Sequence, residues 1–122
     1  MKSTRILLVD DDALLIDAFS ALLAALGHDL RKALSGASAL HVLARFRPQV
    51  AFIDIDMPGM SGMELVRRLR KDDTLSDTTL VACTGHIDEE TKNEAIRAGF
   101  DVCLSKPVGL RRIQAVLAGL SG

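Results

Sequence analysis

The sequence predicts an α/β protein in which helices cover both faces of a parallel β-sheet. Three short runs are apolar at every position, at residues 6–9, 50–53 and 80–83. Strands that are apolar on both faces are typical of buried parallel sheets, whereas antiparallel sheets usually keep one polar face. Stretches with helical character separate these runs, and such alternation indicates parallel strands joined by crossover helices.

The strands are expected in five places. They cover residues 6–9, 29–34, 50–53, 80–83 and 102–104. The second and the fifth have the weaker pattern, and Gly27 and Gly99 precede them. The other three end at Asp10, at Asp54 and at Thr84. Polar residues therefore follow the buried strands at the points where the connections to the helices begin.

The helices are also expected in five places. They cover residues 13–26, 35–46, 62–71, 88–98 and 107–120. The first stops at Gly27 and the fourth at Gly99, because glycine suits the left-handed conformation that ends many helices. Pro48 ends the second, since a residue that precedes proline avoids the helical region. The whole pattern is a (βα)5 repeat with five strands and five helices.

The size and composition exclude several classes of protein. A chain of 122 residues is expected to be a single domain over residues 1–122, large enough to fold without disulfides. Its formal charge of −1 and its lack of Trp and Tyr argue against direct binding of nucleic acid. Cys83 and Cys103 are the only two cysteines, which favours reduced thiols and a cytoplasmic location.

Neither a membrane span nor a secretory signal is expected. Asp17 interrupts the longest apolar stretch, residues 13–26. The first five residues lead into only four apolar residues before three aspartates, which is too short for a signal sequence.

Acidic residues are expected to meet at one edge of the sheet. The first strand is followed by Asp10, Asp11 and Asp12, and the third by Asp54 and Asp56. Working sites of open parallel sheets lie beyond the carboxyl ends of the strands. Crowded carboxylates repel one another unless a cation lies between them, and ligands that are all oxygen favour a hard ion such as Mg²⁺.

A hydroxyl and an ammonium group complete this edge of the sheet. Thr84 ends the fourth strand, and Lys106 follows the fifth. Together with the carboxylates and Mg²⁺ they could hold a phosphoryl group, and a carboxylate can itself be the nucleophile. Taken singly, each residue could equally be a helix cap or a turn residue. Their occurrence in order at four strand ends is what predicts a phosphoryl site.

Five segments together resemble the receiver domain of two-component response regulators. They are residues 6–12, 52–62, 82–85, 98–101 and 106–107. The resemblance respects order and spacing and covers essentially the whole chain. Within it, residues 84–86, 99–101 and 105–108 look like receivers attached to hybrid sensor kinases.

The resemblance implies a flavodoxin-like fold with strand order 2-1-3-4-5 and a phosphorelay function. Asp54 would accept a phosphoryl group from a histidine of a histidine kinase or of a histidine phosphotransfer protein. Lys106 would contact the phosphoryl oxygens. Thr84 would hydrogen-bond the phosphoryl group and draw its loop inward, so that the domain switches between inactive and active states. Such a protein catalyses only its own phosphorylation and dephosphorylation and is otherwise no enzyme.

The resemblance also implies a set of magnesium ligands. Asp11, Asp54 and the backbone carbonyl of Asp56 would bind Mg²⁺ directly, and Asp10 would act through a water molecule. No cofactor besides Mg²⁺ is implied.

The sequence departs from the family pattern at four places. Cys103 stands where the family usually has an aromatic residue that turns inward on activation, and Gly85 stands where Ala is usual. Asp56 and His86 lie two residues beyond Asp54 and Thr84, beside the expected path of the hydrolytic water. We hypothesise that Asp56 and His86 set the lifetime of the phosphoryl group; the alternative is that both are solvated loop residues.

The first expected helix has few polar residues. Only Asp17 and Ser20 are polar in residues 13–26, whereas a surface helix usually has a polar face. The apolar residues considered for an exposed strip are Leu15, Ile16, Phe19, Leu23 and Leu26. Such a strip would be a docking surface for a four-helix phosphotransfer partner or for a second copy in a homodimer; the alternative is a deeply buried helix. The downstream partner is not indicated.

Two other functions compete with the receiver interpretation. The sequence of residues 54–56 also resembles the DxD motif of haloacid-dehalogenase-like phosphohydrolases, with Asp54 as nucleophile and Asp56 as general acid/base. That family places the motif on its first strand, and here it follows the third. The second alternative is a pseudo-receiver, a binding module that works without phosphorylation, for which Cys103 leaves some room.

Overall fold

The structure is a computed structural model that describes residues 3–120. Its strands are β1 (Arg5–Val9), β2 (Asp29–Ala33), β3 (Val50–Asp54), β4 (Thr79–Thr84) and β5 (Val102–Ser105). Its helices are α1 (Ala13–Ala25), α2 (Gly36–Leu43), α3 (Gly62–Leu69), α4 (Glu89–Ala98) and α5 (Leu110–Gly119), with a 3₁₀ turn at Asp73–Leu75. The ends of the expected domain, at residues 1 and 122, lie outside this described range.

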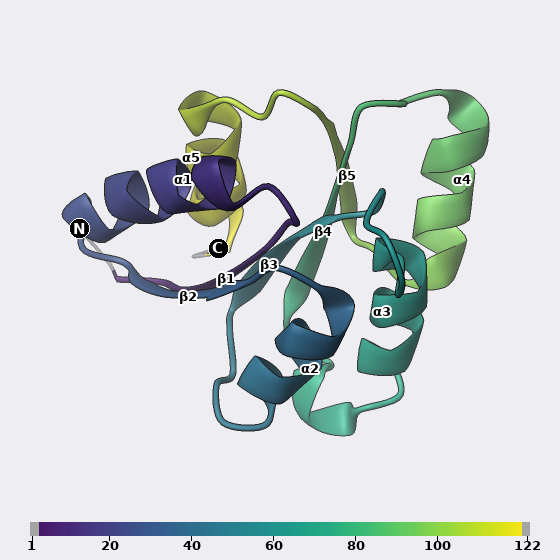
Figure 1. Cartoon of the computed structure of the whole chain (residues 1–122), viewed down its shortest axis with the longest axis horizontal. Coiled ribbons are helices and arrows are strands. Elements are labelled where there is room, and N and C mark those ends of the chain that lie inside the picture. The colour runs from purple at the N-terminus through teal and green to yellow at the C-terminus, as the bar shows by residue number, and fades with distance from the viewer. Residues whose placement is uncertain (1–2, 121–122) are drawn as a thin grey trace.

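The strands form one parallel sheet in the order β2-β1-β3-β4-β5. This confirms the predicted fold class and strand order. Helices α1 and α5 cover one face of the sheet, and α2, α3 and α4 cover the other (Figure 1). The chain crosses from one face to the other after the first helix, so that β1 and β3 lie in the middle of the sheet with their carboxyl ends adjacent.

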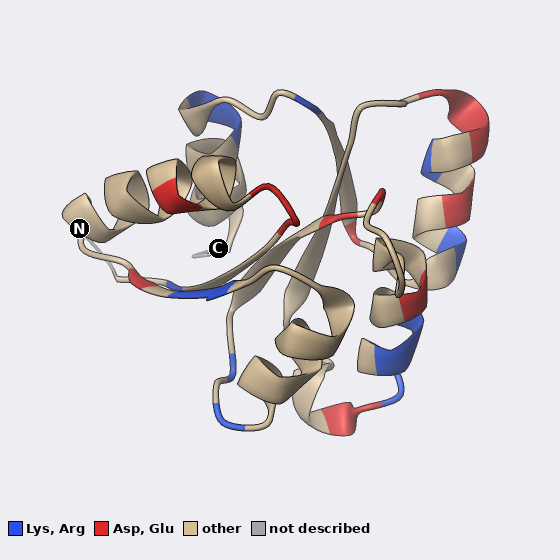
Figure 2. Cartoon of the chain, viewed as in Figure 1, with Lys and Arg blue, Asp and Glu red and all other residues tan. Residues whose placement is uncertain are grey.

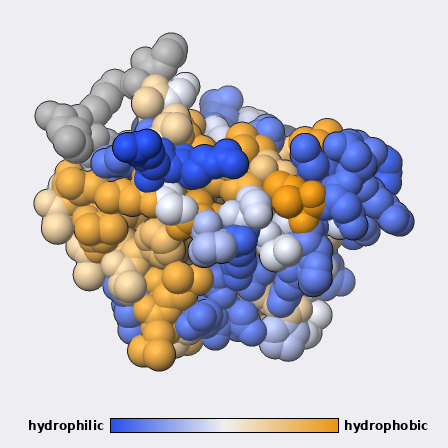
Figure 3. Space-filling model, turned by 90° about the horizontal axis from the view of Figure 1, so that it is seen from above, coloured by the Kyte–Doolittle hydropathy of each residue, from blue (hydrophilic) through white to orange (hydrophobic). Residues whose placement is uncertain are grey.

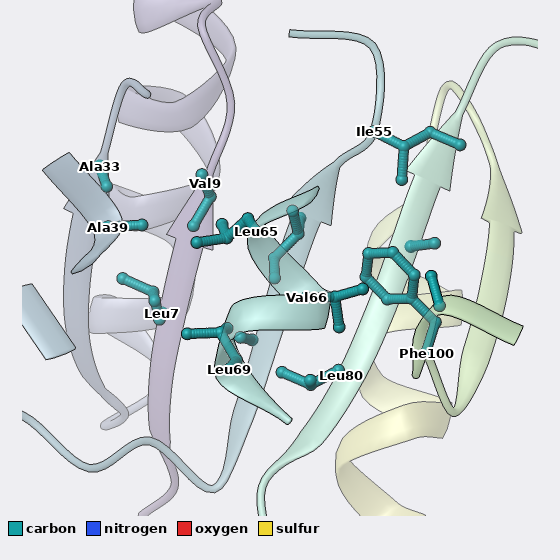
Figure 4. Packing of buried hydrophobic residues seen from close by; sticks show 14 of the residues in the cluster. Leu7, Val9, Ala33, Ala39, Ile55, Leu65, Val66, Leu69, Leu80 and Phe100 are labelled. Atoms are coloured by element: carbon teal, nitrogen blue, oxygen red, sulfur yellow. The ribbon is translucent and has the colours of Figure 1, made fainter. Parts of the chain in front are cut away.

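Two apolar clusters hold the helices to the sheet. On the α2, α3 and α4 face, Leu65, Val66 and Leu69 pack against strand residues such as Leu7 and Leu80 (Figure 4). On the other face the core is formed by residues of β1, β3, β4, β5, α1 and α5. All five residues of β3 are buried, as the continuous apolar run predicts for a central parallel strand.

Several boundaries differ from those predicted. Helix α2 ends at Leu43 instead of residue 46, because the chain turns there and brings Phe46 into the core. Helix α5 begins at Leu110 instead of residue 107, since Gly109 is extended and forms its N-cap. Asp54 and Thr84 belong to their strands as last residues, so both side chains are held by the sheet itself.

The apolar strip on α1 contains different residues from those expected. Ile16 and Leu23 are buried in the core and therefore do not belong to an exposed strip. The exposed large residues are Leu14, at 84% exposure, and Leu22, at 43%. Apolar surface gathers on the α1 side of the molecule, while the α4 side is hydrophilic (Figure 3). No helix within residues 3–120 is long and apolar enough to span a membrane.

Candidate functional site

The carboxyl ends of β1 and β3 bring three carboxylates together. Figure 2 shows the acidic segments after these strands at the same edge of the sheet. One carboxylate oxygen from each of Asp10, Asp11 and Asp54 lies within 4.8 Å of the others. Asp54 is only 4% exposed and Asp10 is also buried, whereas Asp11 faces solvent. Three of the five expected carboxylates therefore lie together, one exposed and two buried, while Asp12 accepts the Leu15 N–H and Asp56 accepts the Thr84 hydroxyl.

Lys106 lies against the two buried carboxylates. Its Nζ is 2.9 Å from Asp10 Oδ2 and 3.2 Å from Asp54 Oδ2. The Lys106 backbone N–H donates to the Thr84 carbonyl at 2.8 Å, which ties the loop after β5 to the end of β4. One ammonium group thus contacts two of the three clustered carboxylates, those of Asp10 and Asp54.

The environment of this cluster shifts two pKa values. Burial raises the pKa of the Asp54 carboxyl, although the Asp56 N–H at 2.9 Å and the Lys106 ammonium both lower it. Partial burial lowers the pKa of Lys106, but the hydrogen bond to Asp10 and the charge of Asp54 outweigh it, so the net pKa is raised. Lys106 is therefore a fixed positive charge at neutral pH, whereas burial disfavours the charged form of Asp54.

The Thr84 hydroxyl has a partner that sequence reasoning did not identify. Thr84 is fully buried, and its Oγ1–H donates to Asp56 Oδ2 at 3.1 Å. The backbone N–H of His86 donates to the same hydroxyl at 3.0 Å. The His86 side chain is exposed and makes this contact only through its backbone. Asp56 thus occupies the hydroxyl that a phosphoryl group would need.

Gly62 allows the loop after Asp54 to close on the site. A Cβ atom at Gly62 would lie 2.6 Å from the Asp54 carbonyl oxygen and 2.6 Å from Ile55 Cα, both backbone atoms. The Gly62 N–H donates to the Ile55 carbonyl at 3.3 Å. The first turn of α3 can therefore approach the end of β3 only because residue 62 has no side chain.

The thiols lie on opposite faces of the sheet. Cys83 packs in the cluster beneath α1 and α5, and burial raises its pKa to about 12. Cys103 is half-buried against the cluster beneath α3 and α4. Cys103 therefore occupies the side of β5 where an aromatic switch residue was expected, with a much smaller side chain.

The donor set fits a hard divalent cation. One oxygen from each of three carboxylates lies within 4.8 Å of the others, and no thiolate or imidazole belongs to this group among the described residues. Two of the three are buried and carry mutual repulsion, which a cation would relieve. Oxygen ligands of this kind suit Mg²⁺.

The fold and the site together define a class of protein. It is a doubly wound α/β protein with an acidic, lysine-containing pocket at the carboxyl ends of its central strands. The family model of the response regulator receiver domain matches residues 6–118. The chain therefore belongs to the receiver domain family. Its function is that of a phosphoacceptor domain in two-component signalling.

Individual relatives agree with this assignment. Protein PilH of Pseudomonas aeruginosa is 35% identical over 119 residues, which cover 94% of this chain and 98% of PilH. The phosphate regulon regulatory protein PhoB of the same organism is 30% identical over 96% of this chain, which spans only 51% of PhoB. The chemotaxis protein CheY4 of Vibrio cholerae superposes with a TM-score of 0.90 at 26% identity, over 98% of this chain and 99% of CheY4.

One relative is a sensor kinase. The sensor histidine kinase RcsC of Escherichia coli is 34% identical over 92% of this chain, which spans 12% of RcsC. The similarity of this chain thus extends to receivers within longer proteins as well as to relatives of its own length.

Proposed function

We propose that Asp54 is the residue that accepts the phosphoryl group. The observation that carries this proposal is a carboxylate at the last position of a central strand, 4% exposed and 3.2 Å from the Lys106 ammonium. A carboxylate oxygen of Asp54 attacks phosphorus while the bond from phosphorus to the donor imidazole breaks. Lys106 then neutralises charge on the transferred group, which is the main requirement of phosphoryl transfer.

The acidic cluster would hold Mg²⁺. Asp11 and Asp54 are proposed as direct ligands together with the backbone carbonyl of Asp56, and Asp10 as a ligand through water. The bound ion would neutralise charge on the phosphoryl oxygens. The exposed Asp11 gives the ion access from solvent, and the buried Asp10 is held in place by the Asp12 N–H at 2.9 Å and by Lys106.

Thr84 is proposed as the residue that reports phosphorylation. In the structure its hydroxyl donates to Asp56. A phosphoryl group on Asp54 offers stronger acceptors, so Thr84 would exchange one acceptor for the other and its loop would move with it. Since Cys103 is small, this movement would not be coupled to an aromatic ring.

The donor is proposed to be a histidine kinase or a histidine phosphotransfer protein, with a cytoplasmic location. Leu14 and Leu22 on the exposed face of α1 are proposed to dock this partner, since α1 begins directly after the acidic cluster. A second copy of the chain is the alternative occupant. Residues 1–122 are proposed to be one domain that has no enzymatic role beyond its own phosphorylation and dephosphorylation.

Intact mass measured over time tests the acceptor. Wild type and Asp54→Asn are incubated with a small-molecule phosphodonor, with and without Mg²⁺. We expect one phosphoryl adduct on wild type that requires Mg²⁺ and none on the variant. Continuous donor hydrolysis without an adduct would instead indicate the phosphohydrolase alternative, and neither adduct nor hydrolysis would indicate a pseudo-receiver.

A further inference from the structure

A cavity lies between α1 and α5, on the face of the sheet opposite α3. Its volume is about 380 Å³. The sheet contributes Phe52 and Cys83 to its floor, and Ile16 and Ile113 form walls from the two helices. These four side chains are buried members of one apolar cluster. The cavity therefore has an apolar floor and apolar walls, although its lining also includes Asp10, Asp54 and Lys106 of the acidic site.

The cavity exists because some of its lining side chains are short. Cys83 on the floor and Val108 in the loop before α5 both border the space. A larger residue at either position would project into it. Water inside such a space finds few hydrogen-bond partners, so an apolar occupant would be more stable there than water. Its size is within the range of pockets that bind small molecules.

One end of the cavity is acidic and reaches the surface. Asp10, Asp12 and Asp54 line this end, and Lys106 is the only cation among the described lining residues. Lys106 is already engaged by Asp10 and Asp54. Asp12 is exposed, and only one of its oxygens has an assigned role, as acceptor of the Leu15 N–H at 3.2 Å. The charge at this end favours a cation at Asp12.

We infer that the cavity between α1 and α5 is a binding site for a small amphiphilic cation. The apolar body of the ligand lies over Phe52 and Cys83, and its ammonium group lies at Asp12. A neutral molecule of the same shape gains the apolar contacts without the charge interaction, and an anion meets three carboxylates. The cavity shares Asp10, Asp54 and Lys106 with the proposed phosphoryl site, but binding of this ligand needs no phosphorylated residue.

Three ligands of one shape test the charge requirement. The probes are 1-naphthylmethylamine, 1-naphthalenemethanol and 1-naphthoate, titrated without Mg²⁺ into the full ¹⁵N-labelled chain and followed by amide chemical shifts. The amine is expected to bind about ten-fold more tightly than the naphthoate, with the alcohol between them, because the charge interaction changes sign across the series. Equal affinity of amine and naphthoate, or no amine binding at millimolar concentration, would overturn the inference.

Variants test the location. Asp12→Asn keeps the helix cap, since Asn caps as well as Asp, and removes the charge. This substitution should lower the affinity for the amine to that for the alcohol and leave the affinity for the alcohol unchanged. Val108→Phe fills the cavity and should abolish binding of both, and Leu14→Phe adds an aromatic ring to the outside of α1 as a matched control.

A second variant that fills the cavity is included in case Val108→Phe does not fold. Cys83→Leu fills the floor of the cavity, and thermal unfolding shows which of the two filling variants is folded. Amine binding at the wild-type affinity in a folded filling variant would show that the ligand lies elsewhere. Loss of binding in the folded filling variants, with the Leu14→Phe control unaffected, supports the site between α1 and α5.

Discussion

Two ion pairs at opposite ends of the sheet differ in how completely their charges are matched. At the amino ends of β4 and β5, Arg70 donates to the carbonyls of Gly99 and Thr78 and to Asp101 Oδ2 at 2.8, 3.2 and 2.7 Å. Asp101 also accepts the Leu80 N–H. One cation and one anion therefore join three segments of the chain, at residue 70, at residues 78–80 and at residues 99–101.

At the carboxyl ends the charges do not balance. Lys106 bridges Asp10 and Asp54, and Asp11 lies beside them without a cation of its own among the described residues. The Arg70 network pairs one cation with one anion, whereas the Lys106 cluster sets one ammonium group beside three carboxyl groups. The two clusters differ in the ratio of cationic to anionic side chains. This ratio can be counted only when the structure shows which side chains are in contact.

Removal of Arg70 should have the largest effect on stability. Arg70→Ala deletes three charge-assisted hydrogen bonds at a partly exposed position, and we expect a loss of about 2–3 kcal/mol in the free energy of unfolding. Chemical denaturation measures this loss. Arg67→Ala, an exposed arginine on the same helix, is the control and should change stability by less than about 0.5 kcal/mol. A folded Arg70→Ala that still forms the Asp54 adduct would confirm that this network is structural.

A side chain at position 62 should disturb the other end of the sheet. Gly62→Ala places a methyl group 2.6 Å from backbone atoms of residues 54 and 55. These atoms cannot rotate away, so we expect about 2 kcal/mol of destabilisation. Phosphorylation should also slow, because the loop after Asp54 shifts. Gly109→Ala, where a Cβ atom meets nothing within 4 Å, is the control. Equal stability of both variants would contradict the close approach.

Much of this fold could be predicted because its signals are local. The run at residues 50–53 is apolar on both faces, and Gly27 and Gly99 mark helix ends, so the strands and their order along the chain follow from neighbouring residues. The acidic cluster could be predicted because parallel strands end at one edge.

Other features depend on which side chains meet in three dimensions. The hydrogen bond from Thr84 to Asp56 joins residues 28 positions apart, and no local pattern indicates it. The burial of Ile16 depends on the tilt of α1 against the sheet, which the composition of the helix does not specify. Arg70 stands in a run of basic residues with Arg67, Arg68 and Lys71, and only its contacts with Gly99 and Asp101 distinguish it from them.

Neutralising Asp54 should stabilise the fold when Mg²⁺ is absent. Burial raises the pKa of Asp54, so the folded state binds a proton more tightly than the unfolded state does. Stability of wild type therefore falls as pH rises from the ordinary pKa of aspartate through the raised value. Asp54→Asn lacks this fall and should be more stable than wild type at neutral pH.

Denaturation at several pH values checks this expectation. The difference between Asp54→Asn and wild type should vanish at low pH, where the wild-type carboxyl is protonated in both states. Added Mg²⁺ should then stabilise wild type more than the variant, because binding to the folded state raises stability. A difference that is constant with pH would show that the charge of Asp54 is not its cause.

The smallest expected effect concerns the lifetime of the phosphoryl group. Asp56 accepts the Thr84 hydroxyl in the structure and so competes with a phosphoryl group for it. Asp56→Asn replaces a charged acceptor by a weaker neutral one, and Thr84 should then hold the phosphoryl group better. We expect dephosphorylation to slow by about three- to five-fold, the equivalent of roughly 1 kcal/mol. Intact mass after removal of the donor gives the rate.

His86→Ala is the matched variant for this competition. His86 contacts Thr84 only through its backbone N–H, which alanine retains. The lifetime of the phosphoryl group in His86→Ala should therefore stay close to that in wild type. Thr84→Ala combined with Asp56→Asn should show no slowing relative to Thr84→Ala alone, since the contested hydroxyl is gone. Slowing in that double variant would mean that Asp56 acts on the hydrolytic water directly, and that the hydrogen bond from Thr84 to Asp56 does not set the lifetime.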